Sequence, residues 1–159
     1  MDDDEAIKLA LDQARLAAKR GEVPVGAVVV HEGQVIAVAG NEREVTGDPT
    51  AHAEILALRR SAEALGTWRL TGATLYVTLE PCPMCAGALI AARISRLVFG
   101  AADPKAGACG SLYNLCVDPR LNHELPVTAG VGAAAAAEML RAWFVDRRRD
   151  AGEDSDEIT

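Results

Sequence analysis

The sequence predicts a three-layer α/β/α fold, in which helices cover both faces of a mixed five-stranded sheet. Two observations lead to this prediction. Short apolar runs of strand length alternate with longer segments in which apolar residues recur at helical spacing. The first two strands are joined by a tight turn and should be antiparallel, whereas helical connections between the later strands require those strands to be parallel.

The N-terminal elements are a helix and a hairpin. Apolar residues recur at helical spacing over residues 4–20 and predict an amphipathic helix that ends at Gly21. Residues 25–31 are apolar and β-branched, and residues 34–40 alternate, so the two runs and the Glu-Gly turn between them predict an antiparallel hairpin. A polar loop, residues 41–48, follows.

The rest of the chain alternates helices with strands. Thr50 is the expected N-cap of a helix that runs to about residue 64. Pro81 and Pro83 fit the start of a later helix, because proline is tolerated in the first turn. The remaining expected strands cover residues 74–79, 95–100 and 125–128, and the remaining helices cover residues 81–92, 111–116 and 133–149.

The composition is that of one globular domain. Half of the 159 residues are hydrophobic and a quarter are charged, which argues against disordered and fibrous chains. No apolar run approaches the roughly 18 residues that cross a bilayer, and the acidic N-terminal sequence lacks the apolar core of a signal peptide. We therefore expect a cytoplasmic protein without a membrane partner. Four cysteines in such a chain favour metal or thiol chemistry over a disulfide framework.

The net charge of −7 is concentrated at the two ends of the chain. Residues 2–5 are all acidic, and residues 150–157 carry a second acidic cluster, while the residues between them are close to neutral. We expect residues 1–149 to form the domain and residues 150–159 to be an acidic, disordered tail, with both acidic ends serving to solvate the chain. Such a distribution is compatible with a local basic patch and a nucleic-acid partner.

Two short motifs carry the chemistry: His52-Ala53-Glu54 and, thirty residues later, Pro81-Cys82-Pro83-Met84-Cys85. Each falls at the start of a predicted helix, and helix starts gather at the carboxyl edge of such a sheet, where ligands bind. Cys82 and Cys85 share a helix face near the N-terminus, whose dipole favours thiolates. Together with His52 they make three ligands and leave the fourth position of a tetrahedral zinc to water, as in catalytic sites.

Taken separately, the motifs have other interpretations. A single histidine on a helix is commonly a hydrogen-bonded core residue, and a Cys-x-x-Cys pair can be a redox pair or half of a structural zinc site. Glu54 and His52 do not share a helix face, so Glu54 is expected to move protons rather than to bind metal. A second metal site at Cys109, Cys116 and His123 is an alternative to unreactive buried thiols, which we prefer.

In combination, the two motifs resemble the signature of the zinc-dependent deaminases of the cytidine-deaminase-like superfamily. The wider sequence is similar to the bacterial tRNA-specific adenosine deaminases, which convert the wobble adenosine of a tRNA anticodon to inosine. Cys109 stands where that family usually has a small residue. The similar stretches are Glu22–Ala27, Asp48–Glu54, Leu75–Glu80, Gly107–Leu112 and Leu121–His123.

The resemblance implies a role for each matching residue. His52, Cys82 and Cys85 would hold one Zn²⁺ per chain, and Glu54 would be the proton shuttle. The expected partners are a tRNA anticodon stem–loop and a second copy of the chain in a homodimer. Asn41 matches the residue that hydrogen-bonds the target base, and the other expected substrate contacts are Ala53, Asp103, Phe144, Arg147, Arg148 and Arg149. The alternatives are that Asn41 is a turn residue and that the three arginines complement the dipole at the end of their helix.

Two other functions stay open at this point. A zinc-dependent deaminase of a free base or nucleoside, such as guanine, cytosine or cytidine, would share the two motifs. Free cytidine deaminases usually have cysteine in place of His52, however, and the guanine and riboflavin-pathway enzymes generally lack the Gly-Ser-Leu loop at residues 110–112. A non-catalytic zinc domain that binds other proteins would not need Glu54. The small residues that would permit close helix approach in a dimer, or would equally suit the core, are Ala86, Gly87, Ala88 and Ala91.

Overall fold

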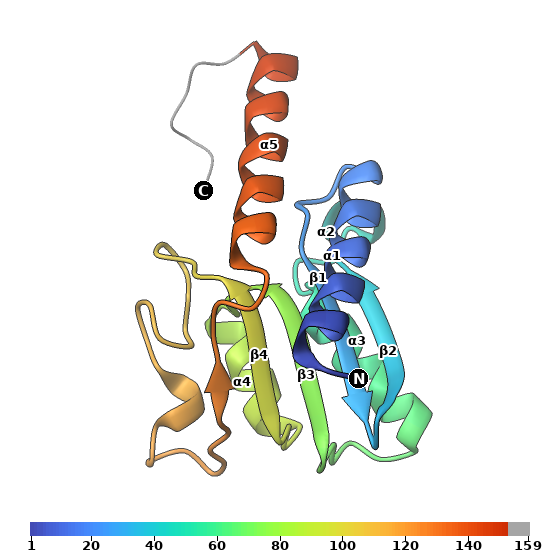
Figure 1. Ribbon diagram of the computed structural model, residues 1–159, viewed down its shortest axis with the longest axis vertical. Coiled ribbons are helices and arrows are strands. Elements are labelled where there is room, and N and C mark those ends of the chain that lie inside the picture. The colour runs from blue at the N-terminus through green and yellow to red at the C-terminus, as the bar shows by residue number, and fades with distance from the viewer. Residues whose placement is uncertain (153–159) are drawn as a thin grey trace.

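The computed structural model describes residues 1–152 and is built on a five-stranded sheet in the order β2-β1-β3-β4-β5 (Figure 1). β1 pairs antiparallel with both β2 and β3, whereas β3 and β4, and β4 and β5, are parallel. The predicted mixed sheet is therefore confirmed. The strands are β1 (Gly26–His31), β2 (Gln34–Gly40), β3 (Ala73–Leu79), β4 (Arg96–Ala101) and β5 (Val127–Thr128).

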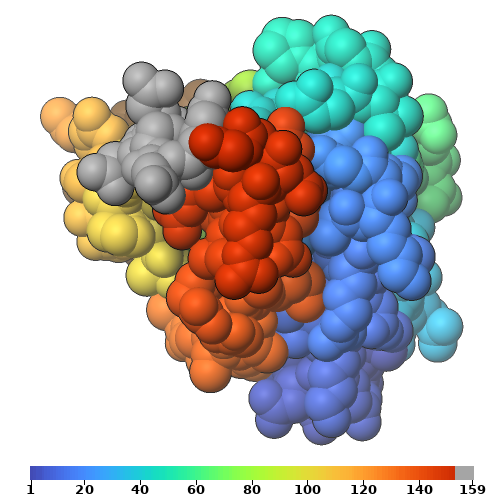
Figure 2. All heavy atoms as spheres, turned by 90° about the horizontal axis from the view of Figure 1, so that it is seen from above, coloured from blue at the N-terminus to red at the C-terminus, as the bar shows by residue number. Residues whose placement is uncertain are grey.

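Helices cover both faces of the sheet, which confirms the three-layer fold. α1 and α5 pack on one face and lie beside each other, as Figure 2 shows, while α3 and α4 pack on the opposite face. α5 extends past the edge of the sheet (Figure 1). The helices are α1 (Asp3–Lys19), α2 (Arg43–Thr46), α3 (Ala53–Leu65), α4 (Pro83–Ala91) and α5 (Ala133–Ala151), and η1 (Leu115–Val117) is a single 3₁₀ turn.

The central strands are buried on both faces because alternate residues enter different cores. Val29 and Leu75 belong to the core beneath α3 and α4, whereas Val28 and Tyr76 belong to the core beneath α1 and α5. This explains why the sequence of β1 is a continuous apolar run rather than an alternating one. No helix among residues 1–152 is both long and apolar enough to cross a membrane.

The carboxyl ends of β2, β3 and β4 lie at the same edge of the sheet. Gly40, the last residue of β2, pairs with Gly26 at the start of β1, and Ala27 pairs with Val77 near the end of β3. The parallel β4 follows the direction of β3. Asn41 and Glu80, which follow β2 and β3, are therefore brought to the same edge as the starts of α3 and α4, as expected for a ligand site in an α/β sheet.

The acidic N-terminal residues are not the solvating segment that the sequence suggests. The Asp2 carboxylate accepts a hydrogen bond from the Glu5 N–H at 2.8 Å, and the Glu5 side chain accepts one from the Asp2 N–H, so the two residues form a capping box on α1. Asp3 accepts two hydrogen bonds from the Arg96 guanidinium, at 2.7 and 2.8 Å. The capping box stabilises the start of α1, and the Asp3–Arg96 pair fixes this helix against β4.

Several of the predicted element boundaries are wrong. The N-cap of α3 is His52, because the Thr50 hydroxyl bonds to the Asp48 carboxylate instead. Within residues 111–116 only the turn η1 is helical, since Ser111 bonds to Glu80 on a different element. The predicted polar loop contains the helical turn α2, and β5 is shorter than expected.

The boundary expected between the domain and an acidic tail falls inside α5. Asp150 and Ala151 belong to that helix, so it continues two residues beyond the predicted end at residue 149. Residues 153–159, which make up most of the segment predicted to be a tail, lie outside the described residues.

Candidate active site

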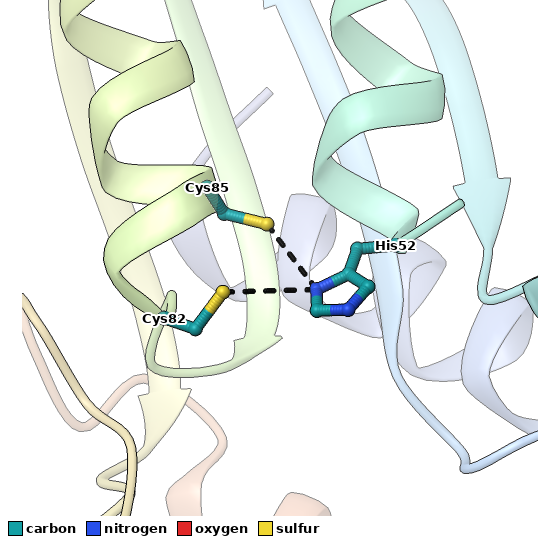
Figure 3. A group of neighbouring side chains, drawn as sticks. All are labelled: His52, Cys82 and Cys85. Atoms are coloured by element: carbon teal, nitrogen blue, oxygen red, sulfur yellow. Dashed lines mark hydrogen bonds between the residues drawn. The ribbon is translucent and has the colours of Figure 1, made fainter. Parts of the chain in front are cut away.

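His52, Cys82 and Cys85 meet at the carboxyl edge of the sheet (Figure 3). His52 is the N-cap of α3, Cys82 is the N-cap of α4, and Cys85 lies in the first turn of α4. His52 Nδ1 lies 3.7 Å from Cys82 Sγ and 3.4 Å from Cys85 Sγ. The structure thus brings together two motifs that are thirty residues apart in the sequence.

The spacing of the three donor atoms fits a tetrahedral metal site. Metal–nitrogen bonds of about 2.0–2.1 Å and metal–sulfur bonds of about 2.3 Å place nitrogen and sulfur about 3.6 Å apart in a tetrahedron. The two observed nitrogen–sulfur distances, 3.4 and 3.7 Å, lie on either side of this value. Among residues 1–152, no fourth His, Cys, Asp or Glu joins the group. The donor set is therefore that of an open site, with three protein ligands.

Proton sharing within the cluster favours a thiolate at Cys82. The hydrogen bond with Cys85 lowers the pKa of Cys82 to about 4, and the same bond, together with burial, raises the pKa of Cys85. The hydrogen bond with Cys82 also raises the pKa of His52. A lowered pKa favours the thiolate form of Cys82, which is the form that binds a metal ion.

Glu54 lies in the first turn of α3 with only 4% of its surface exposed. Burial raises the pKa of its carboxyl above the ordinary value, a shift in the direction that makes a carboxylate a better proton acceptor. Glu54 is absent from the group of metal-ligating atoms, although it lines the same pocket as His52 and Cys82. Its position therefore suits proton transfer beside the donor set.

A pocket of about 580 Å³ opens over these residues. The volume is in the range that holds a small organic ligand or one nucleoside. Its walls come from the segment before β1, from Asn41 and α2, from the loop after β4 and from α5. The predicted site residues that line it are Asn41, His52, Glu54, Cys82, Asp103 and Phe144.

Asn41 is tied to the start of α3. Its side-chain carbonyl accepts a hydrogen bond from the Ala53 N–H at 2.9 Å, and its amide donates to the Val23 carbonyl at 3.1 Å. No side chain of its own N-terminal segment caps α3, so Asn41 satisfies a helix N–H that would otherwise lack a partner. Ala53 is fully buried and does not line the pocket. Asn41 thereby positions the backbone between His52 and Glu54.

The other predicted substrate residues divide into two groups. The Asp103 carboxylate accepts hydrogen bonds from the N–H groups of Lys105 and Ala106 and so shapes the loop that it belongs to. Phe144 lines the pocket from α5 and packs edge-on against Trp143. Arg147, Arg148 and Arg149 lie further along α5, outside the pocket lining, and the Arg147 guanidinium stacks over the Trp143 ring.

Sequence reasoning missed several residues of the pocket walls. Arg43 and Lys105 add positive charge to the lining. Glu22 is buried, and its carboxylate accepts hydrogen bonds from the N–H groups of Glu44 and Val45, which anchors α2 beside the pocket. The available signal was its place in the Glu22–Ala27 stretch that resembles the family, because acidic residues are rarely buried and composition alone gives no reason to expect it.

The remaining cysteines do not form a second metal site in the described part of the chain. Cys109 and Cys116 are buried with their sulfur atoms 3.7 Å apart, while the His123 ring bonds to the Ile94 carbonyl at 2.7 Å. The hydrogen bond between the two cysteines raises the pKa of Cys109 and lowers the pKa of Cys116. Because both side chains are buried, the interpretation as unreactive thiols stays the preferred one.

Comparisons with known proteins agree with this arrangement. The MafB19-like deaminase family model matches residues 1–144. A tRNA-specific adenosine deaminase of Bacillus subtilis (strain 168) is 50% identical over 147 residues, which cover 92% of this chain and 91% of the relative. A solved structure from a study of A-to-I editing by tRNA:A34 deaminases at the wobble position is 50% identical, with a TM-score of 0.83 over 86% of this chain and 99% of that one.

More distant relatives share the fold and the general chemistry. A guanine deaminase structure from Bacillus subtilis is 36% identical, with a TM-score of 0.63, and the match covers 70% of this chain and 71% of that one. Fold, donor set and family model together define the chain as a deaminase. More narrowly, it belongs to the family of tRNA-specific adenosine deaminases.

The bond between Asn41 and Ala53 yields a prediction about metal affinity. Asn41→Ala should weaken metal binding by about 10–100-fold, because the start of α3 and the His52 side chain lose their support. Competition with a chromophoric chelator measures the affinity directly. Asn114→Ala is the control, since the Asn114 side chain caps nothing and lies outside the pocket lining. Equal affinity in the Asn41 variant and the wild type would show that Asn41 does not support the metal site.

Proposed function

We propose that this chain deaminates adenosine to inosine at the wobble position of a tRNA anticodon. The proposal is carried by the buried Glu54 beside an open three-donor metal site in one pocket. Its support is the 50% identity to a tRNA-specific adenosine deaminase and to a structure studied for A-to-I editing of tRNA. The overall reaction consumes one water and releases ammonia.

The proposed cofactor is one Zn²⁺ held by His52, Cys82 and Cys85, the ligand types and number of catalytic zinc sites. When bound there, zinc would lower the pKa of a water molecule towards about 7 and so supply a nucleophile at neutral pH. Glu54 would accept a proton from this water and donate it to N1 of the adenine as carbon 6 is attacked. Glu54 would then transfer the second proton to the exocyclic amino group, which leaves as ammonia.

The proposed base contact is Asn41. Two of its hydrogen-bonding positions are used by Ala53 and Val23, which leaves one N–H and one carbonyl lone pair on a side chain that lines the pocket. A donor and an acceptor side by side match the edge of a purine. Ala53 would contribute through its bond to Asn41, because its own N–H is already donated.

The proposed RNA contacts lie around the pocket mouth and along α5. An anticodon loop presents its base unpaired, so the base can enter the pocket at small energetic cost. Phe144 offers a ring for stacking, and Asp103 shapes a wall of the pocket through its loop. The guanidinium groups of Arg147, Arg148 and Arg149 would bind phosphates, which fits their place on the part of α5 that extends past the sheet (Figure 1).

A free-base guanine deaminase is the second candidate, because a guanine deaminase structure is 36% identical to this chain. The two functions are separated by one assay. A synthetic anticodon stem–loop should yield inosine, and free guanine and cytidine should be left unchanged under the same conditions. Conversion of free guanine without conversion of the stem–loop would favour the second candidate.

The proposed compartment is the cytoplasm. The four cysteines are free thiols, as is usual in a reducing compartment. A cytoplasmic location would also bring the enzyme into contact with its proposed tRNA substrate.

The proposed homodimer would form through the exposed side of α4. Gly87 and Ala91 of this helix line a groove of about 440 Å³ with Trp68 and Leu121, and all four residues are exposed. Ala86, expected on the same face, is instead buried in the core. Leu121→Glu should convert a dimer into monomers in sedimentation equilibrium, whereas Leu16→Glu on exposed α1 should not. A monomeric wild type, or a Leu121 variant that stays dimeric, would contradict this interface.

The contrast between Glu54 and His52 tests the mechanism. Glu54→Gln should keep zinc content and RNA affinity and lose turnover by at least about 10²–10⁴-fold, because an amide cannot accept the water proton. His52→Ala should lose both zinc and turnover, because it removes a ligand. Inosine formation on the stem–loop and elemental analysis are the two measurements. Loss of zinc in Glu54→Gln would make Glu54 a ligand, and substantial residual turnover would assign the proton transfers to another group.

The arginine cluster on α5 yields a prediction about salt dependence. Replacing Arg147, Arg148 and Arg149 with alanine should weaken stem–loop binding and flatten its salt dependence, since each phosphate contact contributes a slope of roughly 0.7–0.9. Binding titrations at several salt concentrations measure this slope, and zinc content should not change. Arg141→Ala is the control, because Arg141 lies on the same helix but is paired with Glu138. An unchanged slope in the triple variant would remove these arginines from the RNA interface.

A further inference from the structure

Glu80 is a buried carboxylate that the proposed chemistry does not use. It follows the last residue of β3, comes two residues before Cys82, and has only 2% of its surface exposed. None of the ion pairs in the described part of the chain involves it. Burying a carboxylate without a cationic partner is costly unless hydrogen bonds compensate, so the bonds it makes indicate what it does.

All of the side-chain hydrogen bonds of Glu80 come from one loop, residues 101–111, which connects β4 to the turn before η1. Oε1 accepts from the Asp103 N–H at 3.0 Å and from the Ser111 hydroxyl. Oε2 accepts from the N–H groups of Cys109 and Ser111, both at 3.0 Å. Three backbone N–H groups spread over nine positions of the loop therefore converge on one carboxylate.

The loop is folded so closely around this carboxylate that a side chain at Gly107 would collide with it. A Cβ at Gly107 would lie 2.3 Å from the Glu80 carboxyl carbon. The loop is also tied to the strand end by the Ala108 N–H, which donates to the Pro81 carbonyl at 2.9 Å. Gly107 is therefore needed for close approach, and the loop and the strand end form one rigid unit.

The same loop forms a wall of the pocket. Ala102, Asp103, Pro104, Lys105 and Ala106 all line it. Asp103 is held by Glu80 directly, and residues 104–106 lie between Asp103 and Cys109, the next position that Glu80 holds. Because Glu80 belongs to the short segment that leads into Cys82, its hydrogen bonds fix this wall relative to the metal-binding end of α4. If this wall were displaced, the substrate would bind in a different position, although the metal-ligating side chains would be unchanged.

We propose that Glu80 is a positioning residue whose carboxylate holds the 101–111 loop as the substrate-facing wall and thereby sets the affinity for RNA. The inference rests on the proposed function, because it takes the occupant of the pocket to be a nucleotide of an RNA loop. It assigns Glu80 no contact with the reacting atoms.

Kinetics on the anticodon stem–loop test the proposal. Glu80→Gln cannot accept hydrogen bonds at both ends of its side chain, so the loop should loosen. We expect KM to rise by about 10-fold or more, while kcat stays within about 3-fold and zinc content is unchanged. Hydrogen exchange at the amides of Asp103, Cys109 and Ser111 should be faster than in the wild type. A general loss of stability would instead speed exchange throughout the protein, so an increase confined to this loop indicates a local effect.

Two further variants keep the test decisive if Glu80→Gln fails to fold. In Gly107→Ala the added methyl group would collide with the Glu80 carboxylate, so this variant should reproduce the increase in KM. Ser111→Ala removes one hydrogen bond and should cause a smaller increase in KM, of about 3-fold. Ser95→Ala, which removes a hydroxyl that accepts the Gly72 N–H away from the pocket, is the control and should leave KM unchanged.

The outcomes separate this inference from the proposed function. A wild type that does not convert the stem–loop would refute the proposed function itself. If the wild type is active, a Glu80→Gln variant with unchanged KM and unchanged loop exchange would overturn the positioning role. A variant that loses zinc and kcat together would also overturn it, because Glu80 would then act on the metal-binding helix rather than on the loop.

Discussion

The site depends on the antiparallel pairing of β1 with β3, which places the start of β1 opposite the end of β3 and beside the end of β2. Gly26 fixes this corner: its N–H bonds to the Thr78 hydroxyl, and a Cβ there would lie 2.0 Å from the Ala10 carbonyl oxygen of α1. Because α1 lies directly against the start of β1, the end of β2 and the end of β3 stay close to each other on either side of it. The starts of α3 and α4, with the three metal-ligating side chains, are held together as a consequence.

Buried polar side chains then fix the segments that the sheet does not contain. Asn41 holds the start of α3, Glu22 holds α2 and Glu80 holds the 101–111 loop, in each case by accepting hydrogen bonds from backbone N–H groups. Ala53 and Ala108 also pack in the core, so hydrogen bonds to the sheet edge add to hydrophobic packing at the start of α3 and in the loop. A pocket built in this way is pre-organised before substrate arrives, which lowers the cost of binding.

The parts of the structure that depend on local sequence could be predicted. The periodicity of α1, the hairpin and the alternation of strands with helices predicted the fold class, because each pattern lies within a few residues. The two motifs predicted His52, Cys82 and Cys85 as a candidate metal site, and the structure brings these three side chains together. The parts that failed depend on distant partners. Thr50 has the right chemistry for a cap, yet Asn41 supplies the acceptor at the start of α3, and Ser111 is recruited by Glu80 instead of starting a helix. Asp3 could not be recognised as structural because its partner, Arg96, is distant in the sequence. The capping box of Asp2 and Glu5, by contrast, is a local pattern that the sequence does contain.

The central claim is that the domain presents an open metal site with two sulfur ligands and one histidine beside Glu54. X-ray absorption at the zinc edge of the purified protein tests this most directly, because it counts sulfur neighbours and measures their distances. The account predicts two sulfur atoms at about 2.3 Å and lighter nitrogen or oxygen neighbours at about 2.0–2.1 Å. A third or fourth sulfur neighbour would mean that Cys109 or Cys116 closes the site, and would contradict a catalytic zinc.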